Sequence, residues 1–527
     1  MPSLREAAAQ CVFVRLGSNL PPTISAEDDV DRVRALLDDC PVGGLLLFRA
    51  HWPDVTDALA TLQQASPLPL LVAADVERGV GQQVDGATLF PHAMAVGDGP
   101  DPEADAAVLA RTTAREARAA GIHWALAPVA DVHVEPRNPI INIRSFGRDP
   151  DRVVDCTSAY IRAARANGLL TSAKHLPGHG RTTEDSHATL PVIDADRSAL
   201  DAVDLPPFRA AVDASVDSLM TAHVVVPALG DAHRPATVSP SLLRTLVRDE
   251  WGFTGVVVSD SLQMEGIAEE RQDPGDDPGA ARLLNAGVDV LLDPADPRAV
   301  VDGLVAAVAD GRLPAERVWE ASNRVRDLKR RLRQIRGPTA FAPAGRDGSG
   351  AVVGGAVHRA HAAAMSRRAL QIDGDGAGWC SRFGSSGEGL VAVLLSSGSS
   401  SATRPFDRRL HALFPKADRY RLSASVGEEA VPPVRQAAQA ASAVLVACFV
   451  EPAAWRDGGL SAPQHDLVAS VSGQDGAAVV VFGAADGLRP AEAADLRIRV
   501  ATTVPDAQDA VAESLAGFAS PHQPAPS

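Results

Sequence analysis

Lysine is almost absent from this 527-residue sequence. Lys174, Lys329 and Lys416 are the only three among 50 basic residues, and the remainder are arginine. Acidic residues outnumber basic ones, which gives a net charge of −16 at pH 7. Nucleic acids and anionic membranes are bound through basic patches, so we expect neither as the main partner of this chain. With so few lysines, the position of each one is informative.

Cysteine and long apolar runs are also scarce. The five cysteines are widely spaced, odd in number and without a CxxC pair, which favours buried free thiols in a reducing compartment over a disulfide framework. The first residues lack a basic segment followed by an apolar stretch of about 7–15 residues. No uncharged run approaches the roughly 18 apolar residues of a membrane span. We therefore expect a soluble, cytoplasmic protein.

Short apolar segments recur through the first 295 residues, separated by helical patterns. Runs of this kind are typical of strands buried on both faces, as parallel strands are. Two intervening segments begin with acidic residues and end at Gly121 and Gly168. Acidic residues in the first turn and a glycine after the last turn are typical start and stop signals of helices. Eight strand–helix repeats favour an α/β fold of the (β/α)8 TIM-barrel type over an open doubly wound sheet. The strands are expected at 11–17, 43–48, 69–75, 123–131, 169–175, 217–225, 254–260 and 287–294.

The composition changes after about residue 330, where glycine, proline and alanine become frequent. Such a stretch is typical of a linker. Four further apolar runs between residues 390 and 504 predict a smaller α/β domain with a mainly parallel sheet. The expected organisation is a catalytic barrel at 1–335, a linker at 336–365, the smaller domain at 366–518 and a disordered tail at 519–527.

Six of the eight expected barrel strands end on a polar residue. The C-terminal ends of barrel strands form the mouth where active sites lie. A single aspartate at a strand end is commonly the N-cap of the next helix, but lysine and histidine are poor N-caps. The pattern as a whole therefore predicts a binding cavity. The residues are Asp75, Asp131, the Lys174–His175 pair, His223, Asp260 and Asp293.

A histidine-rich loop, "KHLPGHGRTTEDSH", follows the fifth expected strand. Asp185 lies two residues before His187, so its carboxylate can accept the Nδ1 proton while Nε2 faces a substrate. A zinc site built from His175, His179 and His187 is an alternative, although the HExxH spacing is absent and a Pro-Gly loop is a poor cage. An ordinary polar loop is another. We favour an acid/base role for His187 and expect no metal.

Asp260, in "GVVVSDSLQMEG", follows directly on a buried strand. A carboxylate held rigidly at the barrel mouth is suited to attack on the anomeric carbon of a sugar. The alternative is that Asp260 or Ser261 caps the following helix. Taken alone, the position does not decide between these two interpretations.

Five segments together resemble the signature motifs of glycoside hydrolase family 3, and specifically of its β-N-acetylhexosaminidase branch. They are "AADVERG", "APVADV…NPIINIRSFG", "KHLPGHG…DSH", "MTAHV" and "VVVSDSLQMEG", within about residues 40–295. The resemblance implies a retaining double displacement with Asp260 as the nucleophile. It implies His187 as the acid/base on a mobile loop, oriented by Asp185. The β-glucosidase branch uses a glutamate from a second domain and lacks the Asp-x-His loop.

The resemblance also implies groups that bind sugar hydroxyls. Asp75, Arg144 and the Lys174–His175 pair match the binding positions of the family, and His223 is expected to line the same pocket. Lys174 could instead form a structural pair with Asp75 or Asp131. An ammonium at a strand tip can donate several charge-assisted hydrogen bonds to sugar oxygens.

Two positions depart from the family pattern. Gln83 stands where the branch commonly has a sugar-binding arginine, so its amide is expected to bind a hydroxyl without the charge. Ser261 replaces a carboxylate next to Asp260, and less like charge there favours the ionised form of Asp260. Neither departure removes a group to which the resemblance gives a catalytic role.

The expected activity is that of a cytoplasmic exo-β-N-acetylglucosaminidase without metal or organic cofactor, with fragments from peptidoglycan recycling as a candidate substrate. A phosphorylase is an alternative, because an imidazole does not repel incoming phosphate as a glutamate would. A β-glucosidase is a third possibility. A catalytically silent sugar-binding protein is the fourth, but it would be expected to lack Asp260, His187 or Asp185.

Overall fold

The computed structural model places most of the chain. The residues that it describes are 3–231, 233–267, 279–342, 352–425, 428–451, 459–484 and 488–519.

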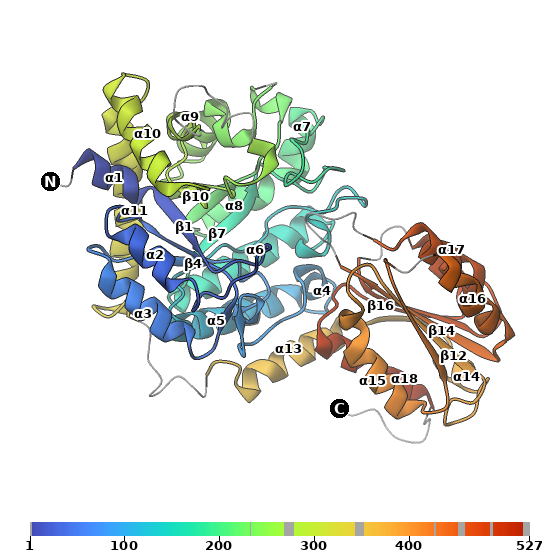
Figure 1. Cartoon of the computed structure of the whole chain (residues 1–527). Helices are drawn as coiled ribbons and strands as arrows, with labels where there is room; N and C mark the ends of the chain where they lie inside the picture. The colour runs from blue at the N-terminus through green and yellow to red at the C-terminus, as the bar shows by residue number, and fades with distance from the viewer. Residues whose placement is uncertain are drawn as a thin grey trace. The chain divides into compact units, whose positions relative to one another are not determined.

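The chain divides into two compact units, each with its own sheet (Figure 1). The smaller unit comprises Phe90–Pro100, Pro139–Arg144 and Ala360–Ser527, and the larger unit comprises the rest of the chain. Two short segments that lie between barrel elements in the sequence are therefore grouped with the smaller unit.

The larger unit is built on an eight-stranded parallel sheet with the order β10-β1-β2-β4-β6-β7-β8-β9. A parallel bridge between Val258 and Val290 joins β9 to the residue before β10, so the two ends of the sheet meet. The expected (β/α)8 barrel is confirmed, and all eight strands overlap the predicted segments. They are β1 (Val12–Leu16), β2 (Gly44–Leu47), β4 (Leu71–Ala74), β6 (Trp124–Ala125), β7 (Leu170–Leu176), β8 (Ser218–Thr221), β9 (Val256–Ser259) and β10 (Leu291–Leu292).

Helices follow these strands and surround the barrel (Figure 1). Their ends follow the sequence signals: Asp101 caps α5, whose C-terminal Gly121 has φ +87°, a conformation that glycine adopts without strain. The helices of this unit with seven or more residues are α1 (Leu4–Gln10), α2 (Val30–Leu37), α3 (Val55–Ala65), α5 (Pro102–Ala120), α6 (Pro150–Ala166), α8 (Pro206–Asp213), the π-type η6 (Ser241–Glu250), α9 (Ala280–Ala286), α10 (Pro297–Ala309) and α11 (Ala315–Arg336).

The barrel interior is filled by large side chains, as expected for a packed core rather than a pore. Trp124 is fully buried, meets Phe13 edge-on at 5.6 Å between ring centroids, and donates its indole N–H to Ser218 Oγ at 3.0 Å. A buried Trp N–H needs such a partner, because leaving it unpaired would cost the desolvation of a polar group. The polar residues at the strand ends lie above this packed layer.

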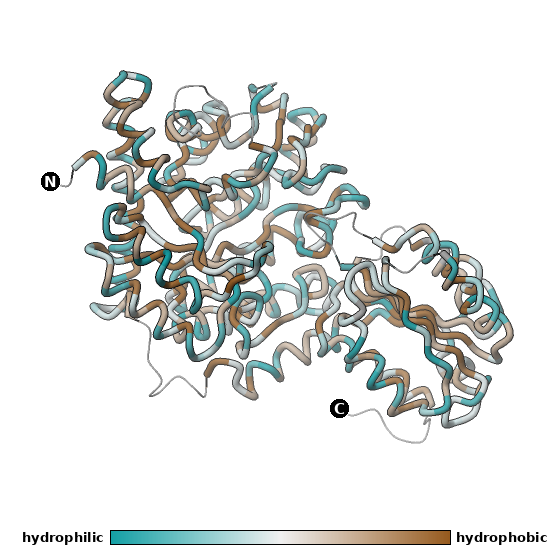
Figure 2. The backbone as a smooth tube through the Cα atoms, in the orientation of Figure 1, coloured by the Kyte–Doolittle hydropathy of each residue, from teal (hydrophilic) through white to brown (hydrophobic). Residues whose placement is uncertain are grey.

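The smaller unit is a six-stranded sheet with the order β11-β16-β15-β14-β12-β13, covered by helices on both faces (Figure 1). All pairs are parallel except β11 with β16. Figure 2 shows the central strands as a hydrophobic band. The strands are β11 (Gln371–Gly374), β12 (Leu390–Ser396), β13 (Asp418–Ser423), β14 (Ala443–Val450), β15 (Ala477–Gly483) and β16 (Leu496–Val500). The principal helices are α13 (Ala356–Arg368), which begins in the larger unit and continues in the smaller unit from Ala360, α15 (Arg404–Leu413), α16 (Val431–Ala440), α17 (Ala462–Ser472) and α18 (Pro505–Ala519).

The two segments grouped with this unit from within the barrel sequence pack against its core. Ile143 is buried in the hydrophobic cluster of the smaller sheet, and Met94 packs against the same cluster. His92 Nδ1 lies 2.9 Å from Thr502 Oγ1. These contacts join the segment before α5 and the segment after β6 to the core of the smaller unit.

The remaining expectations about the structure concern the cysteines, the linker, the C-terminal tail and membrane-spanning segments. All five cysteines are buried and free. Residues 343–351 of the expected linker lie outside the described residues. The linker was expected to end at residue 365, but α13 already begins at Ala356. Of the expected tail, Ala519 ends α18 and the remainder is likewise outside the described residues. Among the described residues, every helix is too short or too polar to span a membrane.

Candidate active site

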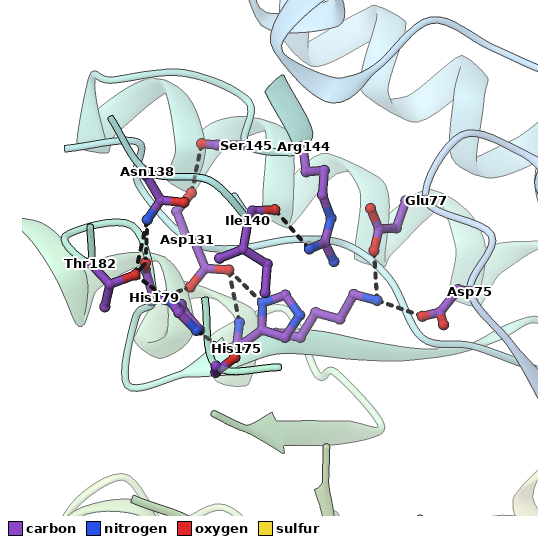
Figure 3. A network of polar contacts seen from close by, with 12 residues as sticks. Asp75, Glu77, Asp131, Asn138, Ile140, Arg144, Ser145, His175, His179 and Thr182 are labelled. Carbon is purple, nitrogen blue, oxygen red and sulfur yellow. Dashed lines mark hydrogen bonds and ion pairs between the residues drawn. The ribbon is translucent and has the colours of Figure 1, made fainter. Parts of the chain in front are cut away.

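Lys174, on β7, is buried between two carboxylates. Its Nζ lies 2.6 Å from Asp75 Oδ1 and 2.7 Å from Glu77 Oε1 (Figure 3). Lys174 is 2% exposed, whereas the Asp75 side chain keeps 28% of its surface exposed. The pair with Asp75 was one expected possibility, and Glu77 is an addition that sequence reasoning missed. Lys174 therefore fixes Asp75 at the end of β4, because a buried ammonium needs anionic partners.

Asp131, after β6, is the most enclosed carboxylate at this end of the barrel, with no exposed surface. Its Oδ2 lies 2.7 Å from Nδ1 of His175 and accepts the backbone N–H of His175, while Oδ1 accepts the N–H of His179 at 2.7 Å (Figure 3). Burial by itself would raise the pKa of Asp131, but His175 and these hydrogen bonds hold its pKa below the ordinary value. An ionised Asp131 makes Nδ1 of His175 the donor in this pair.

Asp260 follows β9 and is partly buried. The N–H of Ser261 donates to its Oδ1 at 2.7 Å. Burial alone would raise the pKa of Asp260, but the charges of His175, His223 and His187, together with this hydrogen bond, hold its pKa below the usual range. These three histidines are His175 on β7, His187 on the loop that follows β7, and His223 after β8.

Asp185 and His187 form a local pair on the loop after β7. Nδ1 of His187 lies 2.7 Å from Asp185 Oδ1, and the same oxygen accepts the backbone N–H of His187 at 2.8 Å. The two side chains are mostly buried, with 13% and 17% of their surface exposed. This is the hydrogen bond that the Asp-x-His spacing predicted.

The Asp-Ser-His loop is docked against the segment that follows Asp260. The N–H of Gly266 donates to Ser186 O at 3.0 Å, and the N–H of Glu265 donates to His187 O at 3.2 Å. A Cβ on residue 266 would lie 2.8 Å from Ser186 O and 2.9 Å from Thr189 O. Only glycine allows this close approach, so residue 266 helps to define where His187 lies relative to Asp260.

Ser261 connects Asp260 to a second buried carboxylate. Its hydroxyl donates to Asp293 Oδ2 at 2.8 Å, and Asp293 also accepts hydrogen bonds from Arg15 on β1 and from Gln263. Burial raises the pKa of Asp293, an effect that the Arg15 contact opposes. Ser261, expected to reduce like charge beside Asp260 or to cap the following helix, thus also links the ends of β1, β9 and β10.

The remaining predicted binding residues, Gln83, Arg144 and His223, each form hydrogen bonds with other parts of the chain. Gln83 is buried, and its Oε1 accepts a hydrogen bond from Asn19 at 3.3 Å. Arg144 donates to Ile140 O at 2.9 Å and belongs to the residues grouped with the smaller unit. His223 is fully buried, with Nδ1 2.8 Å from Thr237 Oγ1 and Nε2 3.3 Å from Ser261 O. The contact with Ser261 O places His223 where it can support the backbone next to Asp260. Sugar contact by Gln83, Arg144 and His223 stays a prediction.

The zinc alternative finds no support in the described part of the chain. Each of His175, His179 and His187 already contacts a carboxylate or hydroxyl through at least one ring nitrogen. Among the described residues, no three histidines, cysteines or carboxylates are grouped so as to hold a metal ion.

A family comparison agrees with this arrangement. The model of the glycosyl hydrolase family 3 N-terminal domain matches residues 3–328, which is more than half of the chain. The chain belongs to glycosyl hydrolase family 3. The resemblance carried by the motifs is therefore confirmed.

Two relatives with curated names match more than half of the chain. The chain is 34% identical over 357 residues to β-hexosaminidase A of Pseudoalteromonas piscicida, covering 62% of this chain and 58% of the relative. It is 36% identical over 306 residues to the β-N-acetylglucosaminidase/β-glucosidase of Cellulomonas fimi, covering 56% and 53%. The chain thus spans little more than half the length of these two relatives.

Solved family 3 structures match almost the whole chain. A glycoside hydrolase family 3 β-N-acetylglucosaminidase from Paenibacillus sp. str. FPU-7 superposes with a TM-score of 0.82 at 27% identity, covering 98% of this chain and 97% of that one. A β-glucoside phosphorylase superposes equally well, with a TM-score of 0.82, at 20% identity. At that identity the second likeness shows a shared fold alone.

Proposed function

We propose that the protein is a retaining exo-β-N-acetylglucosaminidase, which releases terminal β-linked N-acetylglucosamine. The observation that carries the proposal is the Asp185–His187 pair, whose loop is hydrogen-bonded to the segment that follows Asp260. The surroundings of Asp260 hold its pKa below the usual range, so its carboxylate is ionised. The names of the Cellulomonas relative and of the Paenibacillus structure include β-N-acetylglucosaminidase, and the Pseudoalteromonas relative is named a β-hexosaminidase. The role of each residue is part of the proposal.

In the first step, the Asp260 carboxylate attacks the anomeric carbon while the bond to the leaving oxygen breaks. His187 donates its Nε2 proton to that oxygen, and a covalent glycosyl-enzyme ester forms. In the second step, His187 takes a proton from water, which attacks the anomeric carbon and frees Asp260. Asp185 keeps Nδ1 protonated throughout, so that Nε2 is the nitrogen that exchanges the proton.

Substrate binding is assigned to the neighbouring strand ends. Asp75, held by Lys174, has exposed carboxylate surface for sugar hydroxyls, and His175 is oriented by Asp131. Gln83 and Arg144 complete the proposed set. A cytoplasmic location and peptidoglycan fragments as the natural substrate are further parts of the proposal, supported by the family resemblance and by five buried free thiols.

The test is to replace Asp260 and His187 by alanine separately and to assay an aryl N-acetylglucosaminide. Each change is expected to lower kcat by about 100-fold or more, since a nucleophile or a general acid contributes at least that factor. Asp194 and His233 are exposed, and their alanine variants are the matched controls. Mass spectrometry after trapping with a fluorosugar should place the sugar on Asp260. Near-normal turnover by both variants would refute the role assignment.

A phosphorylase is the second candidate, because a β-glucoside phosphorylase has the same fold and an imidazole acid/base does not repel phosphate. Turnover measured with and without inorganic phosphate separates the two activities. If a sugar 1-phosphate is the main product, the protein is a phosphorylase and the proposed hydrolysis is refuted.

A β-glucosidase activity is also tested directly, since the name of the Cellulomonas relative includes it. The assay compares aryl glucoside with aryl N-acetylglucosaminide on the same enzyme. Equal or higher kcat/KM on the glucoside would contradict the proposed substrate preference.

A further inference from the structure

His179 is a histidine in this site that the proposed mechanism does not use. It is 1% exposed, with Nδ1 2.9 Å from Thr182 Oγ1 and Nε2 2.9 Å from Ser186 Oγ. Ser186, also 1% exposed, is the middle residue of the Asp185-Ser186-His187 sequence. A buried imidazole therefore contacts the loop between the proposed acid/base and the carboxylate that orients it.

The hydrogen bonds around Thr182 determine which nitrogen of His179 carries the proton. The Thr182 hydroxyl donates to His179 O at 3.2 Å and accepts from Asn138 Nδ2 at 3.2 Å (Figure 3). With its only proton used, Thr182 Oγ1 must accept from the imidazole, so Nδ1 of His179 is the donor. Nε2 is then the acceptor, and the Ser186 hydroxyl donates to it.

Burial, and next the charge of His175, lower the pKa of His179 to about 4. The ring is therefore neutral near pH 7, and a neutral ring has one donor and one acceptor nitrogen. This matches the two hydroxyl partners that the structure gives it.

Asp131 connects His179 to the sugar pocket. One oxygen of this fully buried carboxylate accepts the N–H of His179, and the other faces Nδ1 of His175 (Figure 3). Asp131 thus fixes the pocket imidazole and the backbone from which the His179 ring contacts the loop.

The backbone of Ser186 forms a second contact that holds the Asp-Ser-His loop, in addition to the side-chain contact with His179. Its carbonyl accepts the N–H of Gly266, in the segment that follows Asp260. Ser186 is consequently held through its side chain by the β7 loop and through its main chain by the loop after β9.

We propose that His179 and Ser186 are positioning residues that hold His187 in its working position opposite Asp260. We call the Ser186 Oγ to His179 Nε2 hydrogen bond the His179–Ser186 latch. The inference rests on the proposed function, in which His187 transfers the proton. Without the latch, the loop keeps its Asp185–His187 pair, but the pair is no longer fixed relative to the leaving oxygen.

The test uses the leaving group of the substrate. An aryl sugar with a strongly acidic phenol, such as 2,4-dinitrophenol, leaves without protonation, whereas a weakly acidic phenol or an alkyl alcohol needs it. Ser186→Ala is expected to lower kcat/KM about 10-fold or more on the poor leaving group and less than about 2-fold on dinitrophenyl N-acetylglucosaminide, because general acid help matters only for the former. A purely structural defect would lower both equally.

A second readout is chemical rescue of the deglycosylation step. Azide attacks the glycosyl-enzyme without needing a general base, so it should restore kcat of Ser186→Ala on the dinitrophenyl substrate and yield the glycosyl azide. His179→Leu should behave in the same way as Ser186→Ala. His179→Gln, whose amide oxygen can accept from Ser186, should recover part of the lost activity.

The controls separate folding, the latch and the proposed function. Ser172→Ala removes another buried hydroxyl of β7, one that has no hydrogen-bond partner among the described residues, and should leave both substrates unaffected. Thermal unfolding of each variant checks that it is folded. His187→Ala is the reference: if it shows no leaving-group dependence and no azide rescue, the proposed function fails. If His187→Ala shows both and Ser186→Ala shows neither, the latch alone is refuted.

Discussion

The imidazole of His187 and the carboxylate of Asp185 meet at 2.7 Å within a single turn of loop, and one carboxylate oxygen serves both the ring and the backbone N–H of His187. The loop therefore holds the imidazole in its correct orientation through local contacts alone. Its position relative to Asp260, in contrast, depends on contacts of the loop with residues farther along the chain and before it, including Gly266 and His179. Orientation and placement of the proposed proton donor are separate properties of this site.

Asp185→Asn tests orientation. The amide keeps the size of the side chain but removes the charge that stabilises the imidazolium formed in the second step, and its NH2 group can reverse the hydrogen bond to Nδ1. We expect kcat to fall by about 100-fold, with the larger loss on substrates with poor leaving groups. Steady-state kinetics on two aryl N-acetylglucosaminides provide the measurement, and an unchanged kcat on both would contradict the role of Asp185.

Gly266→Ala tests placement. The added methyl group would lie within 3 Å of the carbonyls of Ser186 and Thr189, so the Asp-Ser-His loop must move away from the Asp260 segment. We expect kcat/KM to fall at least about 10-fold while the overall fold is retained, because the strain is confined to one loop contact. Gly517→Ala is the control, since a Cβ there meets nothing within 4 Å. Full activity of Gly266→Ala would show that the observed docking is not needed.

The free energy of unfolding should decrease at acidic pH partly because of His179. Its pKa of about 4 in the folded chain lies below the ordinary value of 6.5, since burial and the charge of His175 outweigh the attraction of Asp131 and Asp260. Between these two values the unfolded chain binds more protons, so the free energy of unfolding declines as pH falls from about 6.5 to 4, by about 3 kcal/mol at most. Denaturant unfolding across this pH range should show a shallower decline for His179→Gln than for the wild type, because the variant has no such group to titrate. Identical slopes would contradict the assigned shift.

Glu116 joins α5 to the start of α13 within the larger unit. Its carboxylate accepts hydrogen bonds from Thr88 N and Oγ1 and from Gly354 N, and it lies 2.7 Å from His358 Nδ1. Glu116→Gln replaces an acceptor oxygen by a donor in this buried cluster, so we expect about 2–3 kcal/mol of lost stability with kcat of the folded enzyme unchanged. Glu103→Gln, on the exposed face of α5, should change stability by less than about 0.5 kcal/mol.

Much of the fold was predictable because its central strands are long runs of buried apolar residues. Two of the strands that the sequence analysis missed, β11 and β13, lie at the edges of the smaller sheet and carry polar residues such as Gln371 and Asp418. Edge strands bury one side only or neither, so hydrophobicity does not reveal them. The assignment of residues 139–144 to the smaller unit was equally inaccessible, because it depends on the packing of Ile143 against a core formed much later in the chain.

The candidate site divides in the same way. Asp185, His187 and Asp260 stand in motifs whose spacing predicts the chemistry. The structure pairs Asp185 with His187 and attaches their loop to the segment that follows Asp260. The partners that hold them, such as Glu77 for Lys174 and Asp293 for Ser261, come from other strands. Pairs of this kind depend on the register of a closed barrel, which no local pattern specifies.

The buried carboxylate of Asp131 also limits where this chain tolerates substitution. Since its two oxygens hold the imidazole of His175 and the backbone of His179, a substitution there would disturb both residues at the same time. Under the proposed roles of these two histidines, redesign of sugar preference should begin elsewhere on the barrel rim, and Gln83 is the position from which to begin.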